Sequence, residues 1–124
     1  MESTSISITQ IMNRVSMTLD DMKKIEELAH RVKAQTQQTY RRDYPDTPWM
    51  FDKIEVFVVP GRKYTKIDRG EPGHQSGYLM IDHNSLEIFG IKEYGRPHMK
   101  RRYGTLDTIT DWYWGEYHPI RYNE

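Results

Sequence analysis

The chain has 124 residues, enough for one domain with an ordinary core but too few for two. Lys plus Arg and Asp plus Glu both number 18, so the zero formal charge gives no overall attraction to nucleic acid. The absence of cysteine excludes disulfides and thiolate metal sites. Without a leader-like N-terminus or an apolar run near the ~20 residues that span a bilayer, a cytoplasmic protein with no membrane partner is expected.

Residues 1–45 are predicted to be helical. Apolar residues at helical spacing between positions 8 and 15 indicate either a short amphipathic helix or an arm. Thr18 and Asp21 then form a capping box that begins a longer helix, which should end near residues 40–42, before Pro45. Its narrow apolar stripe fits a helix that lies across a sheet, or one that also packs on its copy in a dimer.

Residues 50–124 are predicted to be β-rich and to carry the ligand site. Alternating patterns rich in β-branched residues predict four antiparallel strands, at residues 51–59, 62–69, 77–82 and 86–92. An exposed loop is expected at residues 70–77, and a short hairpin turn at residues 83–85. A long N-terminal helix followed by a small antiparallel β-sheet is an α+β fold in a single domain.

The middle of the chain carries a net positive charge. Residues 60–102 carry nine Lys or Arg against five Asp or Glu. Residues 93–103 show no period and are predicted to form a long loop, a feature that is usually functional in a compact domain. After it, residues 105–114 form either a helical turn or another strand, and residues 117–122 form an edge strand at best.

The end of this basic loop is a candidate anion site. Guanidinium groups bind phosphate through paired hydrogen bonds, and a following Gly-Thr lets backbone amides approach an anion. A candidate phosphate cradle therefore consists of Arg101, Arg102, Tyr103, Gly104 and Thr105. The alternative is a solvated loop in which Gly104 only turns the chain, since the run matches no P-loop or dinucleotide-binding pattern.

Aromatic residues near the cradle are candidates for stacking on a base. Phe89, Tyr94 and Tyr103 could each stack on a base, which contributes ~1–3 kcal/mol per ring. Tyr94 and Tyr103 are the better candidates because they lie among polar loop residues. Trp112 and Trp114 are instead expected to pack in the core, as large aromatics usually do.

The titratable residues predict a binding protein and not an enzyme. The five histidines make no metal motif, and there is no nucleophile elbow or outstanding carboxylate pair, so no catalytic residue, metal or cofactor is expected. His98 would add positive charge to the basic loop when it is protonated. A degradative enzyme is the alternative, because His98 and Asp107 flank the cradle.

Several phrases between residues 63 and 115 resemble a family of small phage-encoded proteins: GYLMID, LEIFGIKEYG, YGTLDTI and WYWG. Among these, the chain resembles the anti-Thoeris sponge proteins, which sequester a cyclic ADP-ribose signal without degrading it and so silence a bacterial defence system. The resemblance covers close to half the chain. It implies a counter-defence protein in the cytoplasm of an infected bacterial host.

The resemblance also implies a homo-oligomer with nucleotide pockets at subunit boundaries, where arginines hold two phosphates and an aromatic ring holds adenine. A homo-oligomer is also expected because the hydrophobic share, 36%, is low for a small domain. The implied ligand positions are Arg62, Arg69, Phe89, Lys92, Tyr94, Arg96 and Arg101 to Thr105. Two other functions stay open, a nucleic-acid-binding accessory module and a protein-interaction inhibitor of a host system.

Overall fold

The computed structural model describes residues 17–71, 73–93 and 95–122, so the predicted helix at residues 8–15 lies outside the described part. Two helices come first, α2 (Leu19–Asp43) and α3 (Trp49–Asp52). The five strands of the main sheet follow, β1 (Glu55–Pro60), β2 (Tyr64–Glu71), β3 (His74–Asp82), β4 (Glu87–Glu93) and β5 (Arg96–Thr105). The 3₁₀ helix η1 (Ile109–Asp111) and the strands β6 (Trp112–Tyr113) and β7 (Ile120–Arg121) end the chain.

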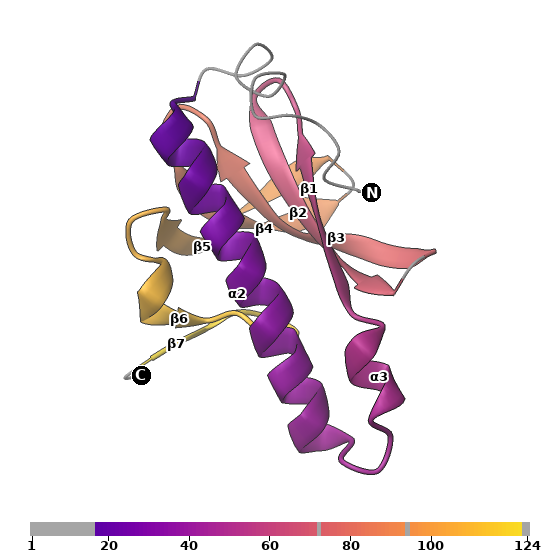
Figure 1. The fold of residues 1–124 in the computed structure, drawn as a ribbon. Helices are drawn as coiled ribbons and strands as arrows, with labels where there is room; N and C mark the ends of the chain where they lie inside the picture. The colour runs from indigo at the N-terminus through magenta and orange to yellow at the C-terminus, as the bar shows by residue number, and fades with distance from the viewer. Residues whose placement is uncertain (1–16, 72, 94, 123–124) are drawn as a thin grey trace.

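Helix α2 begins at the predicted capping box. Thr18 Oγ1 accepts a hydrogen bond from the Asp21 amide at 3.1 Å, and the Thr18 amide donates to Asp21 Oδ2 at 3.4 Å. The helix then lies across one face of the sheet (Figure 1). It buries Met22, Ile25, Leu28, Val32, Thr36 and Thr39. The prediction of a long helix across a sheet is confirmed.

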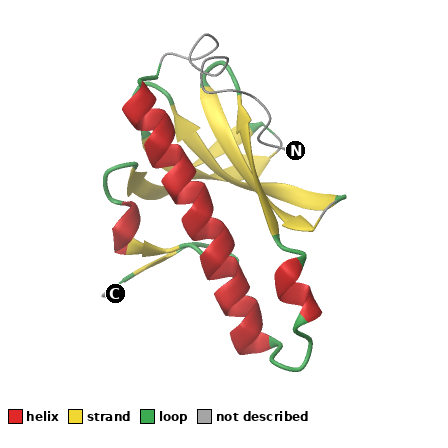
Figure 2. Ribbon diagram, viewed as in Figure 1, coloured by secondary structure: helices red, strands yellow, loops and turns green. Residues whose placement is uncertain are grey.

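The main sheet has the strand order β1-β2-β3-β4-β5, and every neighbouring pair is antiparallel. Helix α2 packs on one face of this sheet, and the combination is the α+β fold expected from the sequence (Figure 2). The core between them contains Ile67, Leu79, Ile81 and Ile88 from the sheet. None of the helices in the described residues is long and apolar enough to cross a membrane.

Two predicted boundaries in the first half of the sheet are wrong. Residues 51 and 52 belong to α3, so the first strand begins at Glu55. The expected loop at residues 70–77 is instead the end of β2 and the start of β3, paired up to Glu71 and His74. Gly73 allows this tight hairpin because its φ of 85° lies in the left-handed region that side chains disfavour.

The predicted long loop at residues 93–103 is also wrong, because β5 occupies most of it and pairs with β4. The pairing of β5 with β4 is irregular, so the sequence of β5 does not show the pattern of a strand. The partner of Phe89 is Arg102 and that of Gly90 is His98, so residues 99–101 bulge out of the ladder. A bulged strand does not show a period of two, which explains why its pattern looked like a loop.

The C-terminal part returns along α2 and completes the core. Trp114 is fully buried, as predicted, and its Nε1 donates to the Ile109 carbonyl at 2.9 Å. Trp112, also expected in the core, is only partly buried. Residues 105–114 contain both predicted alternatives, since η1 forms a helical turn and β6 a short strand that pairs with β7.

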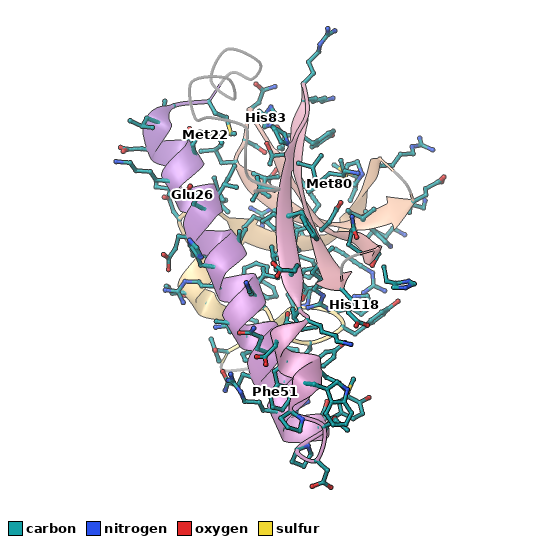
Figure 3. The ribbon with its side chains drawn as sticks, turned by 45° about the vertical axis from the view of Figure 1, so that its right-hand side comes forward. Met22, Glu26, Phe51, Met80, His83 and His118 are labelled. Atoms are coloured by element: carbon teal, nitrogen blue, oxygen red, sulfur yellow. The ribbon has the colours of Figure 1, made fainter. Side chains whose placement is uncertain are left out.

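His83 is a buried histidine in the turn between β3 and β4, at the end of the molecule that carries Met22 (Figure 3). Its Nδ1 donates to the Arg62 carbonyl at 3.0 Å, and its Nε2 lies 2.8 Å from Thr65 Oγ1. Burial lowers the pKa of His83, while the Arg62 carbonyl and Asp82 oppose this in part. The folded state therefore favours the neutral ring.

The stability of the fold should decrease in mild acid because of His83. A folded-state pKa below the ordinary value near 6.5 gives stability that is present above about pH 6.5 and lost as pH falls through the lower folded pKa. We expect urea-unfolding midpoints to fall between pH 7 and pH 5. His83→Gln should show a shallower decrease over the same range, and two parallel profiles would contradict this role for His83.

Candidate functional site

A cavity of about 550 Å³ lies between the second half of α2, the sheet and the C-terminal segment. This volume is within the range of small-molecule sites. The helix and the residues after it contribute Thr36, Thr39, Tyr40, Asp43, Tyr44 and Ile54. The sheet contributes Arg69, Gly70, His74, Ser76, Gly77, Tyr78, Gly90, Ile91, Arg101 and Tyr103, and the C-terminal segment contributes Gly115 to Pro119.

Two bulges in the sheet direct side chains to the cavity. In the β2–β3 ladder, Ile67 pairs with Leu79 and Asp68 with Gly77, which leaves Tyr78 as the extra residue. In β5, residues 99–101 form the second bulge, and Arg101 is the bulged residue that lines the cavity. Bulges commonly change the direction of a side chain beside a functional site.

Arg69 is a mostly buried cation in the cavity wall. Its Nη1 donates to Thr36 Oγ1 at 3.0 Å, and its Nη2 donates to the Glu116 carbonyl at 2.7 Å. Its guanidinium also lies 3.6 Å from the centre of the Tyr78 ring. All these partners are neutral, and in the described part of the chain no carboxylate forms an ion pair with Arg69.

Burial lowers the pKa of Arg69, although an arginine stays charged in proteins. A buried charge without an opposite charge is costly unless a ligand provides one. The cavity next to this guanidinium is therefore suited to an anion.

The two acidic residues of the cavity, Asp43 and Glu116, are both bound to Arg42. Arg42 Nε and Nη2 donate to the two carboxylate oxygens of Asp43 at 2.8 and 3.1 Å, and Nη1 donates to Glu116 Oε2 at 2.7 Å. The hydrogen bond from Arg42 lowers the pKa of Asp43. Arg42 balances part of this negative charge, so Arg69 and Arg101 leave the cavity predominantly positive.

Three of the residues proposed from the sequence line the cavity, namely Arg69, Arg101 and Tyr103. The cradle itself does not form as a unit. Arg102 pairs with Glu87 instead, and Gly104 turns the chain with a φ of 78°. The Thr105 amide donates to Thr108 Oγ1 at 3.0 Å, so it does not face an anion.

The other proposed residues do not line the cavity. Phe89 is buried with 3% of its surface exposed, and Arg96 lies 3.7 Å from Glu93 in an ion pair. Arg62 and Lys92 are exposed elsewhere, and the half-buried His98 stands outside the lining residues. Tyr94 lies outside the described residues.

The aromatic rings that are accessible in the cavity differ from those predicted from the sequence. Tyr103 is only 7% exposed, and its ring contacts those of Trp112 and Trp114 at 5.3 and 6.3 Å between centroids. Tyr44 and Tyr117 line the same cavity with 50% and 82% of their surfaces exposed. These two tyrosines are therefore better placed than Tyr103 to stack on a ligand ring.

Sequence reasoning missed Tyr44 and Tyr117, and it also missed His74 and His118 in the cavity wall. No local motif identifies them, because the fold brings them together from three distant segments. Among the described residues, no group of three or more His, Asp or Glu side chains is placed to hold a metal ion.

This chain matches no family model, no curated protein and no solved structure. The cavity and the chemistry of its walls are therefore what support a function.

Proposed function

We propose that the protein binds a nucleotide-type anion of the cyclic ADP-ribose kind in this cavity and sequesters it, as a phage counter-defence protein. The observation that carries the proposal is Arg69, a mostly buried guanidinium beside the cavity with no carboxylate paired to it in the described residues. A phosphate oxyanion in the cavity would supply the missing negative charge. Such charge-assisted hydrogen bonds are roughly twice as strong as neutral ones.

The rest of the cavity fits the other parts of such a ligand. Arg101 is exposed and lines the cavity from the β5 bulge, and within the described residues it forms no ion pair, so its guanidinium can bind a second phosphate. Tyr44 and Tyr117 offer exposed rings for a base. Gly77 and Gly90 also line the cavity, and side chains pack over both of them, Ile91 over Gly77 and Arg101 and Tyr103 over Gly90.

The acids of the cavity favour binding over turnover. An arginine bound to a carboxylate stabilises its ionised form, which makes the carboxylate a weaker general base. Asp43 uses both carboxylate oxygens on Arg42, and Glu116 is bound to the same guanidinium. Release of an intact ligand is therefore expected, and assembly into a homo-oligomer stays a prediction that size-exclusion chromatography would check.

Isothermal titration with cyclic ADP-ribose isomers, followed by chromatography of the ligand released on heating, tests the proposal. We expect Arg101→Ala to weaken binding about 10- to 100-fold, the loss of one charge-assisted hydrogen bond worth about 1.5–3 kcal/mol. Arg102→Ala is the matched control, because this neighbouring arginine is bound to Glu87 and does not line the cavity. It should leave the affinity unchanged.

Other outcomes would contradict the proposal in different ways. A cleaved ligand would show an enzyme, and an equal loss in both arginine variants would place the site elsewhere. No binding of any isomer, together with salt-sensitive binding of nucleic acid, would favour the accessory-module function. Recovery of a host protein without a small ligand would favour the inhibitor function.

A further inference from the structure

His118 is the histidine of the C-terminal segment that lines the cavity. In Figure 3, His118 lies below Met80 and above Phe51, well away from His83. Its ring contacts the Tyr117 ring at 4.5 Å between centroids and 62° between planes. The residue is exposed, so a molecule in the cavity can contact the imidazole.

Basic residues from three strands of the sheet share the cavity with this imidazole. Arg69 of β2, His74 of β3 and Arg101 of β5 all line it. Burial lowers the pKa of His118, and the positive charges of Arg101, Arg69 and His98 lower it further. Before an anion binds, the neutral form of the ring is therefore favoured at neutral pH.

The negative groups near His118 do not cancel this effect. Glu116, on the same segment, and Asp43 at the end of α2 both bind Arg42, as described above. Tyr40 and Tyr44 line the cavity from the helix side. Among the described residues that line the cavity, Asp43 and Glu116 are the only acids, so a bound anion would add a negative charge that no arginine already binds.

We propose that His118 is a ligand-binding residue that holds the oxyanion together with Arg101, as an imidazolium that takes up one proton from solvent when the anion binds. The inference rests on the proposed function in one respect, that the ligand carries an oxyanion. No bond of the ligand breaks. The proton is added to the unprotonated nitrogen of the imidazole ring. The resulting imidazolium then donates a charge-assisted hydrogen bond to the ligand.

This coupling makes the affinity depend on pH with a defined sign. The anion favours the charged ring, so the pKa of His118 is higher in the complex than in the free protein. Between these two pKa values, affinity decreases as pH rises, by at most about tenfold per pH unit for one proton. The lower end of this pH range is the pKa of His118 in the free protein, which lies below the ordinary value of about 6.5.

The test is an NMR titration of the His118 ring protons between pH 5 and 8.5, with sodium sulfate against sodium chloride at equal ionic strength. Sulfate is a suitable probe because its charge does not change in this range. The resonance is assigned with His118→Gln. We expect sulfate to raise the pKa of His118 by at least about 0.5, as a nearby opposite charge does.

The arginine pair gives the matched variants for this measurement. In Arg101→Ala, the sulfate effect should be lost and the pKa without sulfate should rise, because one repelling cation is removed. In Arg102→Ala, both values should equal those of the unmodified protein, since Arg102 is bound to Glu87.

An unchanged pKa of His118 in sulfate would overturn the inference, whether or not a nucleotide binds. The same response in Arg101→Ala as in Arg102→Ala would also overturn it, because the anion would then not lie between His118 and Arg101. If sulfate raises the pKa but no cyclic ADP-ribose isomer binds, the nucleotide proposal fails while the oxyanion site stands.

Discussion

Trp114→Ala should reduce the free energy of unfolding by about 3–5 kcal/mol, the usual cost of removing a fully buried tryptophan. Trp114 has no exposed surface, and its ring contacts those of Tyr103 and Trp112 at 6.3 and 6.2 Å between centroids. The truncation leaves a large void between α2 and the sheet. It also leaves the Ile109 carbonyl without the hydrogen bond from Trp114 Nε1.

Urea unfolding followed by circular dichroism measures this loss without relying on tryptophan fluorescence. Trp49→Ala is the matched control, because Trp49 lies on α3 with 59% of its surface exposed. Surface truncations of this kind usually change stability by about 0.5 kcal/mol or less. Similar losses in both variants would show that Trp114 does not hold the C-terminal segment in the core.

Gly115→Ala should destabilise the fold by about 3 kcal/mol or more, because the added methyl group meets the backbone of α2. A Cβ at this position would lie 2.2 Å from the Gln35 carbonyl oxygen and 2.8 Å from Thr39 Oγ1. The segment would have to move away from the helix. The hydrogen bond from the Trp114 amide to Gln35 Oε1, now 2.6 Å, would then break.

Gly77→Ala is the matched control in the same cavity wall. Its Cβ would lie 2.5 Å from Ile91 Cδ1, the far end of a flexible side chain that can rotate away. We expect a melting temperature close to that of the unmodified protein for Gly77→Ala, and a decrease of many degrees for Gly115→Ala. Equal melting temperatures would mean that the segment is not held tightly against α2.

The sequence predicts the elements whose signals are local. The capping box at Thr18 and Asp21 fixes the start of α2, and the turn at residues 83–85 joins two strands of regular alternation. Strand β5 escaped prediction because residues 99–101 bulge and Gly104 turns the backbone, which breaks the alternation. Its hydrogen bonds come from β4, and no local pattern encodes that pairing.

The residues of the candidate site are harder to predict from the sequence than the fold is. Arg101 and Arg102 are neighbours in the chain, yet one lines the cavity and the other is bound to Glu87. A loop would allow both to face one phosphate, whereas in β5 Arg101 belongs to the bulge and Arg102 stays paired with Phe89 of β4. His74 and His118 line one cavity only because the start of β3 and the segment before β7 both border it.

The two outer strands of the sheet differ in how readily they can act as templates for another chain. Within the described residues, β1 pairs only with β2 and β5 only with β4. The β1 ladder is regular from Glu55 to Pro60, whereas the β5 ladder is broken by register shifts. Irregular strands resist intermolecular pairing, while a straight one presents an ordered row of amides and carbonyls. Strand addition, by a second copy or by a misfolded chain, is therefore favoured at β1, and the side of the sheet that carries Arg101 is protected from it.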